Sequence, residues 1–95
     1  MSNLHPIPWD RAVPNASGRT VRVSYTTGVE PCNVLDHVAV RYSRTTVTIT
    51  LFEGTDPRAT NQPCIEIAVQ RATDVRLRQA LGHRMLVDGA KSPPR

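Results

Sequence analysis

The chain is poor in aromatic residues, has a single lysine and contains no long apolar run. Its 95 residues include one tryptophan, two tyrosines and one phenylalanine, so a core must be built from aliphatic side chains. No segment approaches the roughly 20 apolar residues needed to cross a bilayer, and residues 1–6 lack the apolar stretch of an export signal. A chain of this length holds one small domain, which excludes a multidomain enzyme.

Motifs for binding phosphate and metal are also missing. Neither Gly-x-Gly nor Gly-Lys-Ser/Thr occurs, so nucleotide binding has no support. The three histidines, His5, His37 and His83, fall in separate segments. Neither cysteine has a second cysteine or a histidine at the spacing of a zinc site. We therefore expect no metal and no cofactor.

A nucleophilic triad could combine Ser24 or Ser43 with His37 and Asp36. Adjacent residues on a strand point to opposite faces, so we expect that Asp36 does not orient His37. The sequence thus predicts a protein that is not an enzyme.

Positive charge comes almost entirely from arginine. The chain has 12 basic residues against 8 acidic ones, and Lys91 is the one lysine. The guanidinium group suits bidentate recognition of phosphate or carboxylate, but arginine enrichment is also expected from GC-rich coding, and we favour that explanation. The basic residues are scattered, and Arg76 with Arg78 is the nearest approach to a stripe.

Proline and glycine divide the chain into three parts. Residues 1–18 contain Pro6, Pro8 and Pro14 without apolar periodicity, which predicts an extended leader ahead of the fold. Within it, Trp9 either pins the leader onto the domain or anchors a partner, and we favour pinning. Residues 19–88 form the predicted domain, and residues 89–95 a flexible tail.

Apolar residues between these ends alternate with a period of two, which predicts strands. The clearest runs are residues 21–25, 38–42 and 47–51. The last two are separated by a short turn and predict a hairpin.

A long loop over residues 53–63 follows the hairpin. Beyond it, residues 65–69, 75–77 and 85–87 predict three further strands. An amphipathic helix over residues 64–81, stopped by Gly82, is the alternative, and we favour strands. The predicted fold class is all-β: about six short antiparallel strands in a small sandwich or partly open barrel.

The two cysteines, Cys32 and Cys64, precede predicted strands at one end of the domain. A strand lying between them in a single sheet would separate their backbones beyond the roughly 7 Å that a disulfide tolerates. Pairing therefore implies a sandwich or barrel, adds roughly 3 to 4 kcal/mol of stability, and implies an oxidising compartment. We favour the disulfide over the alternative, which is two free buried thiols in a cytosolic protein.

Several short segments carry a resemblance to a known group of proteins. They are Gly28, Val29, Glu30, Pro31 and Cys32, then Val34, Leu35 and Asp36; Val47 to Leu51 with Glu53 and Gly54; Cys64, Ile65, Glu66, Ile67 and Ala68; and Leu81, Gly82, Arg84, Val87 and Asp88. This pattern resembles small uncharacterised β-domains of exported proteins and lipoproteins in high-GC Gram-positive bacteria. The resemblance implies export and a Cys32–Cys64 pair, and it implies no activity. The start of the chain departs from the group, because it has no lipoprotein signal.

The favoured function is an exported, non-catalytic interaction module that binds a protein or cell-surface partner through loops. Its candidate partner-binding residues are Glu30, Glu53, Asp56 and Arg58. These residues fall in two loops, residues 26–32 and 53–63. Both loops could equally serve only to connect strands.

The alternative function is nucleic-acid binding by a small barrel, in which arginines follow phosphates and an aromatic ring stacks on bases. Its candidate residues are Arg22, Arg41, Arg76, Arg78 and Phe52. Tyr25 and Tyr42 continue the apolar faces of their strands, so we expect them in the core. Phe52 is then the outward aromatic residue of these strands.

Overall fold

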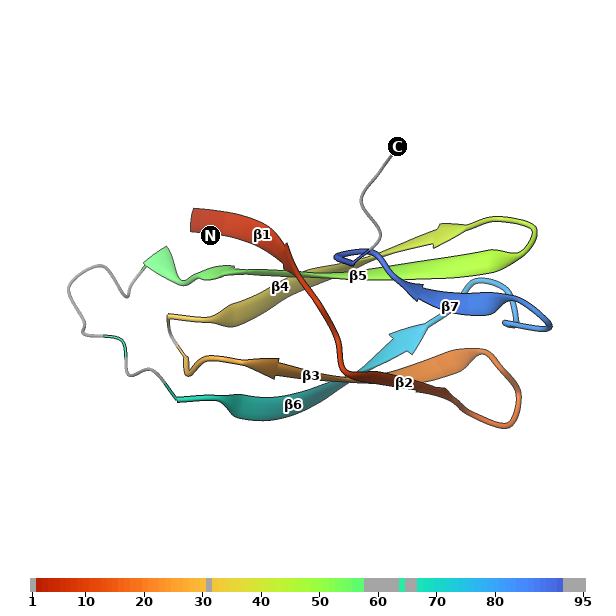
Figure 1. Cartoon of the computed structure of the whole chain (residues 1–95), viewed down its shortest axis with the longest axis horizontal. Helices are drawn as coiled ribbons and strands as arrows, with labels where there is room; N and C mark the ends of the chain where they lie inside the picture. The colour runs from red at the N-terminus through yellow and green to blue at the C-terminus, as the bar shows by residue number, and fades with distance from the viewer. Residues whose placement is uncertain (1, 31, 58–63, 65–66, 92–95) are drawn as a thin grey trace.

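The computed structural model describes residues 2–30, 32–57, 64 and 67–91, and these residues form strands and turns without any α-helix. The strands are β1 (Ser2–Ile7), β2 (Arg11–Pro14), β3 (Thr20–Thr27), β4 (Val34–Tyr42), β5 (Thr46–Thr55), β6 (Val69–Arg76) and β7 (Met85–Asp88). They make two facing sheets (Figure 1). The prediction of a small all-β sandwich is confirmed.

Each sheet is organised around one central strand. In the larger sheet, β5 lies between β4 on one side and β1 and β7 on the other, while β3 lies between β2 and β6 in the smaller sheet. The predicted hairpin is β4–β5, and Ser43 closes its turn through hydrogen bonds with Thr46. All pairs are antiparallel except β5–β7, which is parallel.

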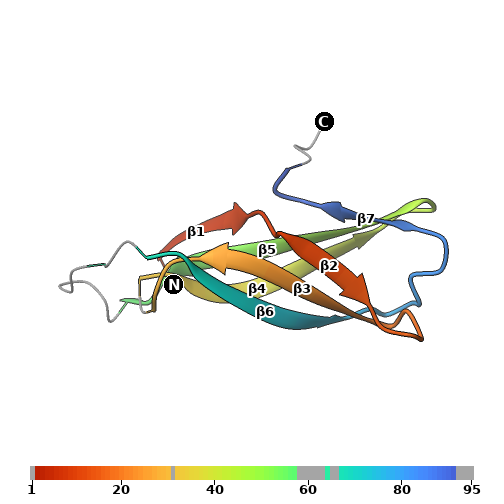
Figure 2. The same cartoon turned by 60° about the horizontal axis from the view of Figure 1, so that its bottom comes forward.

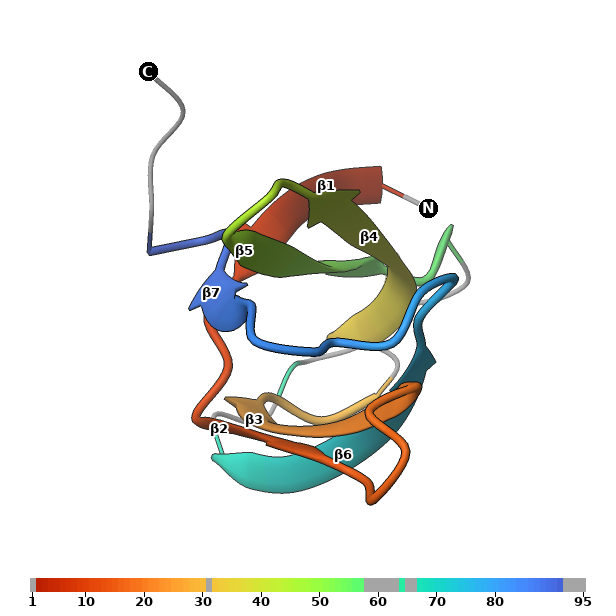
Figure 3. The same cartoon turned by 90° about the vertical axis from the view of Figure 1, so that its right-hand side faces the viewer.

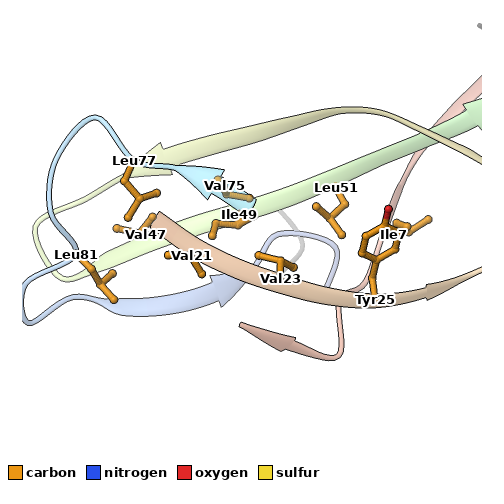
Figure 4. Close-up of a cluster of buried hydrophobic side chains, with 10 residues drawn as sticks. All are labelled: Ile7, Val21, Val23, Tyr25, Val47, Ile49, Leu51, Val75, Leu77 and Leu81. Atoms are coloured by element: carbon orange, nitrogen blue, oxygen red, sulfur yellow. The ribbon is translucent and has the colours of Figure 1, made fainter. Parts of the chain in front are cut away.

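Aliphatic residues of the central strands fill the space between the sheets. Alternation in β3 and β5 turns every second side chain inward, and Figure 4 shows these side chains meeting between the sheets. The largest fully buried side chains are Val21, Val23, Val47, Ile49 and Leu51. Tyr25 is buried and Tyr42 packs against the core, as predicted.

The N-terminal segment differs from its prediction. Residues 1–18 were expected to form a leader ahead of the fold, but β1 pairs with β5 in one sheet and β2 pairs with β3 in the other. The prolines do not prevent this, because both strands lie at sheet edges, where a missing N–H is tolerated. This segment therefore belongs to the sandwich.

Trp9 lies where the chain crosses between the two sheets. Its indole N–H donates to the carbonyl of Ile49 at 3.0 Å, and its backbone N–H donates to the buried Asp88 carboxylate at 2.9 Å. The pinning role predicted for Trp9 is confirmed. Figures 2 and 3 show the crossover from β1 to β2 on the β7 side of the sandwich, away from β4.

The stretch before Leu81 also differs from its prediction. Instead of two strands at residues 65–69 and 75–77, one strand, β6, pairs with β3 through all of its residues. Ile67 lies outside β6 with 55 % of its surface exposed, and Ile65 is outside the described residues. Pairing with the full length of β3 satisfies backbone groups that two shorter strands would leave open. The alternative helix is absent from the described part of residues 64–81.

Candidate functional site

The disulfide end of the sandwich carries the loops predicted to bind a partner. Cys32 follows the turn after β3, Cys64 precedes β6, and the two residues form a disulfide with a Cα–Cα distance of 6.0 Å. The hydroxyl of Thr55, at the end of β5, donates to the carbonyl of Cys32 at 3.1 Å. The disulfide thus joins the segment that follows β3 to the one that leads into β6, and the Thr55 hydrogen bond attaches the end of β5 to the first of these segments.

The predicted partner-binding residues have different environments at this end. Glu30 is exposed, and its carboxylate lies 3.6 Å from the guanidinium of Arg71. Asp56 is half-buried directly after β5, and Arg58 is outside the described residues. Glu53 was expected in a loop, but it lies in β5 with only 5 % of its surface exposed. Because β5 extends to Thr55, the Glu53 side chain points into the sandwich and not towards a partner.

Polar side chains surround Glu53 inside this end. The Thr27 hydroxyl donates to one carboxylate oxygen of Glu53, and Nε2 of His5 lies 3.8 Å from the other oxygen. The Thr27 contact comes from β3 and joins the two sheets, whereas the His5 contact comes from β1, the neighbour of β5 in the same sheet. A buried carboxylate requires such partners to offset its lost hydration. The contacts make Glu53 a structural anchor between strands.

Tyr25 lies in the same environment as Glu53, and this environment changes the pKa of its phenol. Its burial raises the pKa of its phenol above the usual value near 10; Arg71 opposes the rise, and Glu53 and Glu30 add to it. The neutral phenol is therefore the form that the folded state favours.

The candidate nucleic-acid residues are divided between opposite surfaces. Arg22 and Arg76 point outward from the β2–β3–β6 sheet, whereas Arg41 and Phe52 point outward from the other sheet. Arg78 lies over the ring of Tyr42, at 4.6 Å from its centroid. One strand of nucleic acid cannot follow both outer faces at once, so the structure does not unite these residues into a site.

Besides Arg78, two more of these residues have partners within the chain. The guanidinium of Arg22 lies 3.6 Å from the Asp74 carboxylate across the β3–β6 pair. Phe52 stacks on His37, with ring centroids 4.6 Å apart. The Phe52 ring therefore has one face covered before any base approaches.

Asp36 and His37 contradict an expectation from strand alternation. Nδ1 of His37 and a carboxylate oxygen of Asp36 are 2.6 Å apart, although these neighbours were expected to point to opposite faces. The register of β4 shifts between Leu35 and His37, and such a bulge breaks alternation. The pair is exposed, and no serine is bonded to it among the described residues.

Two shallow hollows, missed by the sequence analysis, lie on the outer face of the β2–β3–β6 sheet. Their volumes are about 590 and 510 Å³, and Arg11 and Ser24 line both. Val13 and Asp74 line the larger one. Arg11 could have been placed there only from the pairing of β2 with β3, which the leader prediction excluded.

The described ranges hold neither a cluster of metal-binding side chains nor a membrane-spanning helix. No group of three or more His, Cys, Asp or Glu side chains there is arranged to hold a metal ion. Those ranges also contain no helix with the length and hydropathy to cross a membrane.

Comparison with protein-family models, curated proteins and solved structures gave no match for this chain.

Proposed function

We propose that this chain is an exported, non-catalytic interaction module that presents the loops of its disulfide end to a protein or cell-surface partner. The observation that carries the proposal is the Cys32–Cys64 bond. Structural disulfides persist in oxidising compartments and are rare where glutathione and thioredoxin keep thiols reduced.

The position of the bond supports a role for these loops. Cys32 and Cys64 belong to connections, not to strands, so the bond restrains the two connections that it joins. A restrained loop loses less conformational entropy when it binds a partner. Glu30 is the described residue at this end that is best placed for contact, because it is exposed on the turn before Cys32.

The compartment is tested by trapping the thiols in the native host. Cells are quenched in acid, alkylated without reductant, and the protein is analysed by intact mass. We expect no alkylation of Cys32 or Cys64 in protein from outside the cytosol. Recovery of the protein from the cytosol with both thiols alkylated would contradict the proposal.

Binding is tested with the partner recovered from the host surface by crosslinking. Glu30→Arg reverses the charge of the exposed turn and should weaken capture, whereas Arg11→Glu, a reversal on the outer face of the smaller sheet, should leave it unchanged. Equal capture by all three proteins would exclude the turn as the contact.

Nucleic-acid binding is the second candidate, and the separation of Arg22 and Arg76 from Arg41 and Phe52 gives it less support. It predicts binding to single strands that weakens steeply with added salt, because phosphate contacts release counterions. Absence of binding at low salt would eliminate it.

A further inference from the structure

The outer edges of the two sheets differ in how well they are protected against pairing with another strand. β2 is a four-residue strand that ends in Pro14, and β1 contains Pro6 and a register irregularity. β4 has a bulge between Leu35 and His37. Short length, proline and bulges are the usual means of blocking an edge.

β6 has none of these protections. It pairs with β3 through eight residues in one unbroken register, and it contains neither proline nor glycine. Within the described residues β3 is its one ladder partner. β6 is therefore the longest regular edge that the smaller sheet leaves open.

The direction of the free backbone groups follows from one hydrogen bond. The N–H of Leu77 donates to the carbonyl of Arg19 at 2.8 Å, one step beyond the Thr20–Arg76 pair. Hydrogen-bonded pairs alternate along an antiparallel ladder, so the odd-numbered residues of β6 bond to β3. The remaining residues direct their N–H and C=O groups to the open edge: Gln70, Ala72, Asp74 and Arg76. Their side chains are all exposed on the outer face.

The charged side chains on this edge are complementary to those on the same edge of a second copy. A second copy can place its own β6 antiparallel to this one about a two-fold axis, and matched outer faces require the pairing to be centred on a residue. Centring it on Val75 sets Asp74 opposite Arg76 of the second copy, and Arg76 opposite its Asp74. Centring it on Asp74 instead would oppose two carboxylates. Of the β6 residues on which the pairing could be centred, Val75 is the one that forms both of these ion pairs.

Centring the pairing on Val75 also allows the free backbone groups of the two edges to form hydrogen bonds. Asp74 and Arg76 are both residues whose N–H and C=O groups face the open edge, so each opposed pair can exchange hydrogen bonds. The ladder ends beyond Leu77, because the N–H of Arg78 donates to the hydroxyl of Tyr42 at 2.8 Å.

We propose that two copies of this chain associate through their β6 edges, centred on Val75, to form one continuous six-stranded sheet. The partner is a second copy and the contact is a short ladder with two cross-strand ion pairs. It is separate from the loops at the disulfide end, so this proposal and the proposed function can fail independently.

The test measures self-association by sedimentation equilibrium of the oxidised chain. A short ladder buries less than the roughly 1,200 Å² of a typical stable interface, so we expect a weak, concentration-dependent dimer. Asp74→Arg opposes two arginines to two arginines, and Arg76→Asp opposes two acids to two acids. Each variant should raise the dissociation constant by roughly tenfold or more.

Mixing the two variants gives the decisive measurement. A chain with Asp74→Arg paired with a chain with Arg76→Asp restores both ion pairs, so the equimolar mixture should form a heterodimer within about threefold of the original affinity. Restoration also demonstrates that both variants fold. Arg11→Asp is the matched control: it makes the same charge change on the same face, at the opposite edge of the sheet, and should change nothing.

Three results would overturn the proposal: a chain that stays monomeric throughout the concentration range, single variants that associate like the unmodified chain, or a mixture that gains nothing over its components. A chain that is monomeric but binds an extended peptide at β6 would also overturn it in favour of another occupant.

Discussion

The interior of the sandwich is aliphatic at one end and polar at the other. Along β5 the inward series Val47, Ile49 and Leu51 is followed by Glu53, and along β3 the valines give way to Tyr25 and Thr27. Both ends exclude water, since Glu53 is as buried as much of the core. The first end does so mainly with apolar area, whereas the second also encloses polar groups.

This difference shows where each kind of stabilisation acts. At the aliphatic end, burial of methyl and methylene groups provides the free energy. At the polar end, hydrogen bonds contribute little net stability because they replace bonds to water. The disulfide is located at this second end, where it restrains the unfolded chain and compensates for the smaller apolar core.

The largest effect is expected from removing the covalent link. Cys32→Ser with Cys64→Ser opens a loop with a sequence separation of 32 residues. Loss of this loop constraint should lower the free energy of unfolding by roughly 3.5 to 4 kcal/mol. Urea denaturation of the oxidised chain and of the double variant measures this difference. A loss below about 1 kcal/mol would mean that the polar end holds together without its disulfide.

The next largest effect is expected in the aliphatic interior. Ile49→Ala leaves a cavity at a fully buried position and should cost about 3 kcal/mol. The same denaturation experiment measures it, with Arg41→Ala on the outer face of the sheet as control, for which we expect less than about 0.5 kcal/mol. Similar losses for the two variants would contradict the assignment of packing to this end.

A smaller effect is expected from the Thr27–Glu53 hydrogen bond. Thr27→Val keeps the shape of the side chain but removes the hydroxyl that Glu53 accepts from. The buried carboxylate loses one partner, which should cost roughly 1 to 3 kcal/mol. Thr26→Val is the matched control, because the Thr26 hydroxyl also donates to a carboxylate, that of Asp10 at 2.7 Å, but does so on the exposed outer face. Water can replace this exposed partner, so the change should cost less than about 0.5 kcal/mol. Equal costs would show that the polar interior contributes nothing specific.

The smallest effect is confined to alkaline pH. Burial raises the pKa of Tyr25 above its usual value near 10, so its contribution to stability is complete below that pH and is lost as pH rises through the raised pKa. Tyr25→Phe should flatten this alkaline decline, measured by urea denaturation at a series of pH values. Tyr42→Phe, at the aliphatic end, should retain the decline. If stability still declines at alkaline pH in Tyr25→Phe, another titrating group causes the decline.

Much of the fold was predictable from local pattern. The strands around Val23, Val40 and Ile49 alternate so regularly that their inward faces are evident, and both cysteines lie in the connections that bring them together. β1 and β2 were missed because Pro6, Pro8 and Pro14 are normal signals of extended linkers. The bulge at Asp36 was missed because one inserted residue leaves no compositional mark.

The candidate site was less predictable than the fold. Glu53 lies beside turn-forming residues, and its burial depends on β1 and β3, which are distant in sequence. The hollow beside Arg11 requires the pairing of β2 with β3. The free edge of β6 exists only because β3 lies on one side of it and no described strand lies on the other.

Alternation of apolar and polar side chains decided which faces are buried, since burial of aliphatic groups is a local preference repeated every second residue. Which strands became neighbours, which edge stayed open and which acid was enclosed were decided in three dimensions. These features arise from contacts between segments far apart in the chain, and a pattern with a period of two carries no information about its distant partner.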